Sequence, residues 1–143
     1  MRTIPELLDG IVHEPTQRTS DGFDLTLAAV FNVSDSGRVD FGGDELAEAS
    51  VDPVPTWKRN QDDDYEWWQL DAGHYLIEYN ESLTSEEVSL TVQAREELLE
   101  RGAFHPTVTV GRLPRMPLSV GGAGIRLKEN ARISTIVDVG QFQ

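Results

Sequence analysis

Cysteine is absent from this chain of 143 residues, so disulfide bonds, thiol catalysis and thiolate zinc sites are excluded. No apolar run approaches the roughly 20 residues that a membrane-spanning helix requires. The first ten residues also lack the basic start and the apolar stretch of a secretory signal. We therefore expect a cytoplasmic protein with no membrane partner.

Basic residues are scarce: the chain has 12 Lys and Arg against 25 Asp and Glu, a net charge of −13. A nucleic-acid partner is disfavoured, because neutralising phosphates requires a basic surface. Only Lys58 and Lys128 are lysines. Few lysines among many carboxylates favour a salt-rich cytoplasm, where salt screens charges to within about 3 Å at 1 M. An ordinary acidic protein is the alternative.

The charge is unevenly distributed along the chain. Residues 1–100 contain 6 basic and 23 acidic residues, whereas residues 101–143 contain 6 basic and 2 acidic residues. The basic segment either pairs with acidic strands, within the domain or between subunits, or gathers arginines around an anionic ligand. We favour the first interpretation, because structural ion pairs are commoner than binding sites. The cations of this segment are Arg101, Arg112, Arg115, Arg126, Lys128 and Arg132.

The length fits a single domain over residues 1–143. Apolar and polar residues alternate over residues 22–33, which predicts a strand. A turn that ends at Gly37 predicts a hairpin, with a returning strand over residues 38–41. The polar stretch 42–64 is expected to be mostly loop.

One helix is predicted, over residues 94–101, because Gly102 is suited to end it and Pro106 prevents its continuation. Pro114 and Pro117 are expected to break the chain after this helix. Short strands between turn residues then predict a mainly β domain with one short helix. Further strands are expected at residues 66–70, 74–79, 87–92, 125–127 and 131–139.

Isolated motifs give little chemistry. His13, His74 and His105 lack metal-ligand spacing, so no zinc site is expected. The glycines at 121–124 precede a strand without a following Lys-Ser/Thr, which favours a turn over a phosphate loop. The acidic triplet at 62–64 is interpreted as a solvated loop, with a Mg²⁺ site as the minor alternative.

Four stretches, taken in order, resemble one family. GFDLTLAAVF with GRVDFGGDE (22–45) resembles the G-x-DL and IDF hairpin of archaeal deoxyuridine triphosphatases (dUTPases) and dCTP deaminases. HYLIEYNESL (74–83) resembles their Y-x-I-x-x-NE strand, and AREELLERGAFH (94–105) resembles their RSSLLR-x-G helix. GIRLKENARISTI (124–136) resembles their closing GI-x-L-x-x-NARI-x-QL strands and is the most specific match.

The resemblance implies a β-clip fold, a distorted jelly roll that assembles as a homotrimer with active sites between subunits. It implies a deoxypyrimidine triphosphate as substrate, with Mg²⁺ carried on the phosphates and no zinc. The diphosphatases of the family use an Asp to activate water against the α-phosphate. The deaminases use a Glu to move protons during attack at the base C4. Both reactions need a carboxylate placed for proton transfer.

The helix segment departs from this family pattern. Arg95 keeps the first arginine, but Glu96 and Glu97 replace two serines, and Glu100 replaces the second arginine. In the family, the serine and the second arginine face the phosphates. A like-charge pair at 4 Å costs about 4 kcal/mol at an effective dielectric near 20, before salt screening. The substitutions therefore exchange attraction for repulsion.

The catalytic segment departs as well. The stretch that matches the family's D-x-GY/F-x-G turn has no acidic residue from His105 to Val120. Ser119 falls where the deaminases have their Glu, and Thr135 stands where the family has its closing Gln. Both general bases are missing from their expected positions.

Two hypotheses remain. The first is a dCTP deaminase or dUTPase with a rebuilt site, because guanidinium groups suit phosphate oxygens. The second is a catalytically silent trimer that binds a nucleotide or another protein, and the missing acid–base groups favour it. In the rebuilt site, the candidate bases are Glu96, Glu97 and Glu100, and the candidate substrate ligands are Arg95, Thr107, Arg112 and Arg115.

The net charge predicts a salt-dependent stability. A chain with a net charge of −13 repels itself when salt is removed. We expect the melting temperature to fall between molar and low KCl. An unchanged melting temperature would contradict the assignment to a salt-rich cytoplasm.

Overall fold

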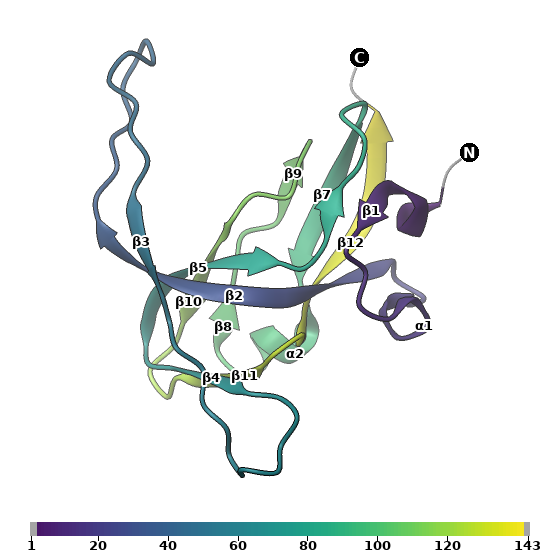
Figure 1. Ribbon diagram of the computed structural model, residues 1–143. Helices are drawn as coiled ribbons and strands as arrows, with labels where there is room; N and C mark the ends of the chain where they lie inside the picture. Colours follow the sequence, from purple (N-terminus) through teal and green to yellow (C-terminus); the bar gives the residue numbers. More distant parts are fainter. Residues whose placement is uncertain (1–2, 142–143) are drawn as a thin grey trace.

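The structure is a computed structural model that describes residues 3–141. It is a mainly antiparallel β fold with a strongly curled sheet (Figure 1). The helical segments are short: η1 (Ile4–Leu7, 3₁₀), α1 (Glu14–Gln17) and α2 (Glu96–Leu99). The strands are β1 (Leu8–Asp9), β2 (Phe23–Asp35), β3 (Ser50–Pro53), β4 (Trp67–Leu70), β5 (Gly73–Tyr79), β6 (Ser82–Leu83), β7 (Val88–Ala94), β8 (Ala103–Phe104), β9 (Val108–Val110), β10 (Met116–Val120), β11 (Ile125–Lys128) and β12 (Arg132–Gln141).

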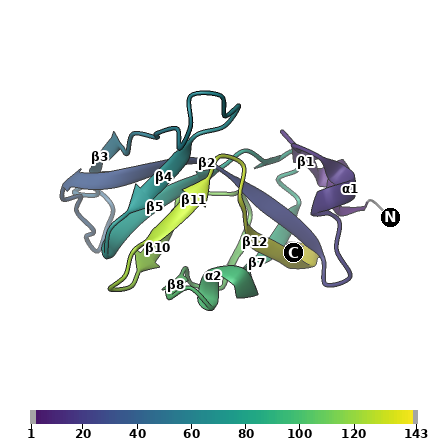
Figure 2. The ribbon, with the colours of Figure 1, turned by 90° about the horizontal axis from the view of Figure 1, so that it is seen from below.

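Strand β2 is the axis of the fold. The main sheet has the order β8-β10-β5-β2-β12-β7-β9, and β3 pairs with the far end of β2. Figure 2 shows β2 running from the end that carries α1 to the end that carries β3. Register shifts interrupt its pairing with β3, β5 and β12. Such irregularities bend strands and increase twist, which explains why the sheet curls.

The core lies on the inner side of this curled sheet. Leu25, Leu27, Ile77, Leu90 and Ile136 are fully buried. Burying one such side chain contributes about 1.5–3 kcal/mol, so these strands supply most of the driving force for folding. The mainly β architecture predicted from the sequence is confirmed.

Residues from two of the segments that resemble the family, 74–83 and 124–136, meet in one buried polar cluster. Glu81 is 3% exposed and accepts hydrogen bonds from the backbone N–H of Thr26 (2.9 Å), the Thr26 hydroxyl (2.6 Å) and the Gln17 amide (2.9 Å). Asn80 donates to Thr26 Oγ1 (2.9 Å) and to Asn130 Oδ1 (2.8 Å). Asn130 has a φ of 64°, a conformation that Asn tolerates well. These residues fasten α1, β2 and the β11–β12 turn together.

The predicted returning strand over 38–41 is wrong. Arg38 forms one isolated bridge with Ala47. The Asp40 carboxylate accepts hydrogen bonds from the backbone N–H groups of Gly43 and Glu45, which places the turn there. The strand that returns along β2 is β3, inside the stretch expected to be loop. The hairpin is therefore longer than the turn at Gly37 suggested.

The predicted helix over 94–101 is shorter in the structure. Ala94 ends β7, where it pairs with Ser134, so that the helix begins only after Arg95. Gly102 follows with a φ of 82°, as a terminating glycine should. A second short helix, α1, was not predicted. No helix in residues 3–141 is long and apolar enough to cross a membrane.

The prolines of the basic segment interrupt the sheet less than expected. Pro117 lies inside β10, opposite Leu76 of β5. On the other side of β10, β8 pairs only with Ser119 and Val120. Pro117 therefore occupies an edge position where no partner needs its missing amide hydrogen, which a strand tolerates.

His105 is buried, 4% exposed, in a chain of hydrogen bonds. Its Nδ1 lies 2.9 Å from the Pro106 carbonyl oxygen and its Nε2 lies 2.7 Å from Ser134 Oγ. A carbonyl only accepts, so Nδ1 carries the proton and Nε2 accepts from the Ser134 hydroxyl. The Tyr79 hydroxyl lies 2.7 Å from the same Ser134 oxygen and donates to it. Burial lowers the pKa of His105 and favours the neutral ring.

This buried histidine predicts a loss of stability in acid. In the unfolded chain His105 takes up a proton near pH 6.5, whereas in the folded chain its pKa is lower. The contribution of the neutral His105 to the free energy of unfolding is therefore complete above pH 6.5 and decreases as the pH falls below this value. We expect the melting-temperature difference between wild type and His105→Gln to shrink from pH 7.5 to pH 5.5. His74→Gln, at an exposed histidine, is the control. An equal difference at both pH values would contradict the assignment.

Candidate functional site

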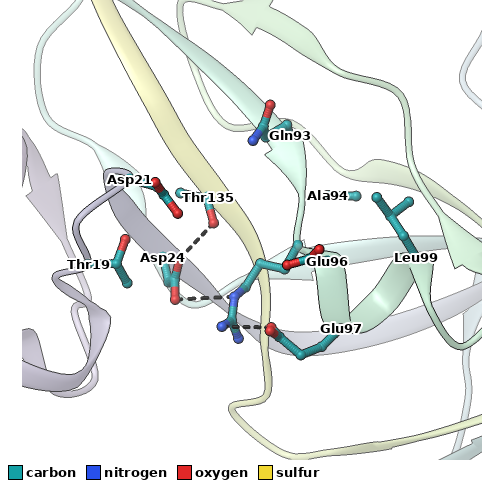
Figure 3. Close-up of a pocket in the computed structure, with 10 residues that line it drawn as sticks. Thr19, Asp21, Asp24, Gln93, Ala94, Glu96, Glu97, Leu99 and Thr135 are labelled. Carbon is teal, nitrogen blue, oxygen red and sulfur yellow. Dashed lines mark hydrogen bonds and ion pairs between the residues drawn. The ribbon is translucent and has the colours of Figure 1, made fainter.

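A cavity of about 360 Å³ lies beside α2 and is called the α2 cavity here. Figure 3 shows its side chains converging from β2, β7, β12, α2 and the turn before β2. Polar residues make up most of its wall. The lining residues are Thr19, Asp21, Asp24, Gln93, Ala94, Arg95, Glu96, Glu97, Leu99 and Thr135.

Asp24 is the buried carboxylate of this cavity, with 1% of its surface exposed. Its Oδ1 accepts a hydrogen bond from the Thr135 hydroxyl (2.7 Å). Its Oδ2 lies 3.1 Å from Arg132 Nη1 and 3.3 Å from Arg95 Nε. Two guanidinium groups and a hydroxyl thus compensate one desolvated charge. Removing one partner of such a group typically destabilises a fold by several kcal/mol.

All three nitrogens of the Arg95 guanidinium group have partners within the chain. Nε pairs with Asp24, Nη2 lies 2.7 Å from Glu97 Oε2, and Nη1 donates to the Arg132 carbonyl oxygen at 3.2 Å. The guanidinium group therefore pairs with both the Asp24 and the Glu97 carboxylate, which are labelled in Figure 3. A ligand phosphate could reach this arginine only by displacing Glu97, whose side chain is 56% exposed.

The α2 cavity is acidic. Asp21, Asp24, Glu96 and Glu97 line it together with one cation, Arg95. Two like charges 4 Å apart repel by about 1 kcal/mol even in bulk water, and more where the site is partly buried. A polyanion entering this cavity therefore meets repulsion and no unpaired cation on its wall. No group of three or more His, Asp or Glu side chains in residues 3–141 is placed to hold a metal ion.

The structure brings together part of the predicted site. Arg95, Glu96 and Glu97 line the α2 cavity, as one cluster at the start of α2. Glu100 does not line it; this exposed side chain faces solvent 4.0 Å from Arg101.

The other predicted ligands lie elsewhere in the chain. Thr107 is exposed between β8 and β9. Arg112 and Arg115 are exposed in the loop between β9 and β10, and the Arg115 guanidinium group lies 4.3 Å from the centre of the Phe31 ring. None of these three residues lines the α2 cavity of this chain.

Sequence reasoning missed two central residues, Asp24 and Thr135. Strand alternation placed Asp24 on a polar face, but that face is covered by arginines from distant segments. The sequence signal that could have identified Asp24 was its position in the GFDL stretch, which resembles the family's G-x-DL motif. Thr135 was noted only as a departure from the family's Gln, yet its hydroxyl orients the buried carboxylate. The segment 105–120, which has no acidic residue, contributes no side chain to the α2 cavity. The Ser119 hydroxyl oxygen lies 2.9 Å from Nδ1 of the exposed His74 instead.

Comparisons with known proteins agree with this architecture. No family model matches the chain. A probable deoxyuridine 5'-triphosphate nucleotidohydrolase of Methanosarcina acetivorans is 29% identical over 96% of this chain and 80% of its own length. The protein of the same name from Methanosarcina mazei is 28% identical over 93% of this chain and 78% of its own length.

The fold has a solved counterpart. The crystal structure of 2'-deoxycytidine 5'-triphosphate deaminase from Agrobacterium tumefaciens matches with a TM-score of 0.57 at 17% identity. The match covers 91% of this chain and 42% of the deaminase, so the chain spans less than half of that protein. The chain thus shares the β-clip fold of the deaminase and resembles the two archaeal proteins over nearly its whole length.

Proposed function

We propose that the protein is a dCTP deaminase/dUTPase-like protein of deoxypyrimidine nucleotide metabolism that has lost the usual catalytic acid and the free phosphate-binding cations. It is a catalytically silent cytoplasmic homotrimer. The observation that carries this proposal is the guanidinium group of Arg95, in which each nitrogen already has a partner: Asp24, Glu97 and a backbone carbonyl. Its remaining role is that of a nucleotide-binding or protein-interaction module.

The lost chemistry has two parts. A general base must stand within hydrogen-bond reach of the proton it removes. The segment 105–120, where the family carries that base, contains no acid. Binding a phosphate needs an accessible edge of a guanidinium group, and the Glu97 carboxylate occupies that edge of Arg95. Mg²⁺ would enter with a ligand's phosphates, because residues 3–141 place no cluster of three carboxylates for it.

The sheet supports self-assembly. Among the described strands, β8 and β9 end the main sheet, and each has one unpaired side. Open edges are commonly covered by another chain or element. A closed ring of identical subunits covers them without leaving a further edge, which supports the homotrimer.

A rebuilt active site is the second candidate, and one observation favours it. Glu96 and Glu97 both line the α2 cavity beside Arg95. A carboxylate beside an arginine is a plausible arrangement for proton transfer near a phosphate. In this version Glu96 or Glu97 is the base, and Arg112 and Arg115 would come from a neighbouring subunit.

Turnover separates the two candidates. We expect no pyrophosphate release and no deamination when the protein is incubated with dUTP or dCTP and Mg²⁺ in about 1 M KCl, a salt level that screens the acidic chain. Turnover that survives in Glu100→Gln but disappears in Glu97→Gln or Glu96→Gln would establish the rebuilt site. Glu100 is the matched control, because it lies on the same segment outside the cavity.

Glu97 also predicts a change in binding. Replacing Glu97 with Gln removes the anion that holds Arg95 Nη2. We expect Glu97→Gln to bind Mg²⁺–tripolyphosphate roughly tenfold more tightly than wild type, since about 1.4 kcal/mol of relieved repulsion gives a factor of ten. Calorimetric titration measures the difference, and Glu100→Gln should show none. Equal affinities in wild type and Glu97→Gln would mean that this pair does not control access to Arg95.

A further inference from the structure

Residues 36–49, between β2 and β3, form a projection called the arm here. Figure 1 shows it rising away from the sheet, with its tip far from the other elements. Strand pairing between β2 and β3 stops at Asp35 and Ser50, so that the body of the protein holds the arm only at its base.

The arm is ordered by its own hydrogen bonds. Arg38 and Ala47 exchange two backbone hydrogen bonds of 2.9 and 3.0 Å. The Asp40 carboxylate accepts from Gly43 N (3.0 Å) and Glu45 N (2.8 Å). The Arg38 side chain donates to the Glu45 carbonyl oxygen at 3.1 Å. A projection fixed in this way loses little conformational entropy when it docks.

The arm exposes large apolar side chains. The exposed fraction is 107% for Phe41, 90% for Val39 and 63% for Leu46. Phe41 and Val39 are therefore almost fully exposed to solvent in the single chain, and Leu46 is exposed over more than half of its surface. Contiguous exposed apolar surface on a soluble protein is typical of an interaction site.

The charge of the arm points to the kind of partner. Asp40, Asp44, Glu45 and Glu48 stand against the single cation Arg38. With a net charge of −13, most of another copy's surface would repel this arm. A docking partner must therefore offer a cationic surface with apolar side chains beside it.

The β9–β10 loop, residues 111–115, has this character and is called the basic loop here. Arg112 and Arg115 are exposed, and the half-buried Leu113 and Pro114 lie between them. No acidic residue occurs between positions 105 and 120. Within the described residues, neither Arg112 nor Arg115 has an ion pair, and the Arg115 guanidinium group lies over the face of the Phe31 ring.

Three other surface arginines differ from these two, because each has an acidic partner. Arg18 faces Glu14, Arg59 faces Asp63 and Arg101 faces Glu100 on their own chain. Their charges are already compensated locally. The two arginines of the basic loop are left for a partner.

We propose that the arm of one subunit docks on the basic loop of a second copy of this chain. Phe41 and Val39 pack on Leu113 and Pro114, and the acidic residues of the arm face Arg112 and Arg115. Different surfaces of the two copies meet, and such a head-to-tail contact closes into a ring when the rotation permits. The inference rests on the self-assembly in the proposed function and names the surfaces that make it.

Light scattering in about 1 M KCl tests the apolar part of the contact, because charges are screened at that salt. We expect a trimer of 15.9 kDa chains for wild type and a single-chain mass for Val39→Ser/Phe41→Ser. Val12→Ser is the matched control, since Val12 is 48% exposed and lies outside both the arm and the edge strands β8 and β9. Circular dichroism should show an unchanged sheet in the arm variant, because neither side chain contributes to the core.

A charge exchange tests the partner. At the lowest salt that keeps wild type folded, Asp44→Lys/Glu45→Lys and Arg112→Glu/Arg115→Glu should each assemble at least tenfold more weakly. Combining all four substitutions in one chain should restore assembly, because the second copy then offers the complementary charge.

Each outcome decides the inference. A wild-type trimer that persists in Val39→Ser/Phe41→Ser overturns the arm contact and leaves the homotrimer standing. A single-chain mass for wild type overturns both, while the nucleotide assays are unaffected. If the variant that carries all four charge substitutions fails to assemble, the basic loop is not the surface on which the arm docks.

Discussion

The charge of Asp24 is the constraint around which the sheet is assembled. A carboxylate with 1% exposure is tolerated only when its charge is compensated. Compensation comes from β12 through Arg132 and Thr135, and from the start of α2 through Arg95. These contacts connect three segments that are distant in sequence. The central strand β2 is thereby held between its neighbour β12 and the short helix that follows β7.

The same interaction explains the chemistry of the α2 cavity. An arginine that serves as structural counter-ion to Asp24 keeps only its outer edge for a ligand, and Glu97 occupies that edge. The resemblance to dUTPases and dCTP deaminases leads us to expect a phosphate at this position. In this chain the Arg95 guanidinium group faces Asp24 and Glu97 instead. Serving as the counter-ion of a buried carboxylate and gripping a phosphate are competing uses of one guanidinium group.

Much of the fold was predictable from the sequence, because it depended on local patterns. Alternation over residues 22–33 and 131–139 located the two long strands, and Gly102 marked the end of α2. The reach of the hairpin was not predictable, because the side-chain contacts of Asp40 decide where the chain turns. The site was predictable only where one motif carried it, at Arg95, Glu96 and Glu97. Asp24 and Thr135 become site residues through pairings across the sheet, which no local pattern displays.

The buried cluster of Glu81, Asn80 and Asn130 bears on what the likeness between these sequences means. The segments that match the family best supply this cluster, and it lies away from the α2 cavity. Amino acids that the fold needs for its own integrity thus supply part of the resemblance, and none of these three residues lines the α2 cavity. Two descendants of one ancestor can therefore look alike along their whole length and still differ in whether they process a nucleotide at all.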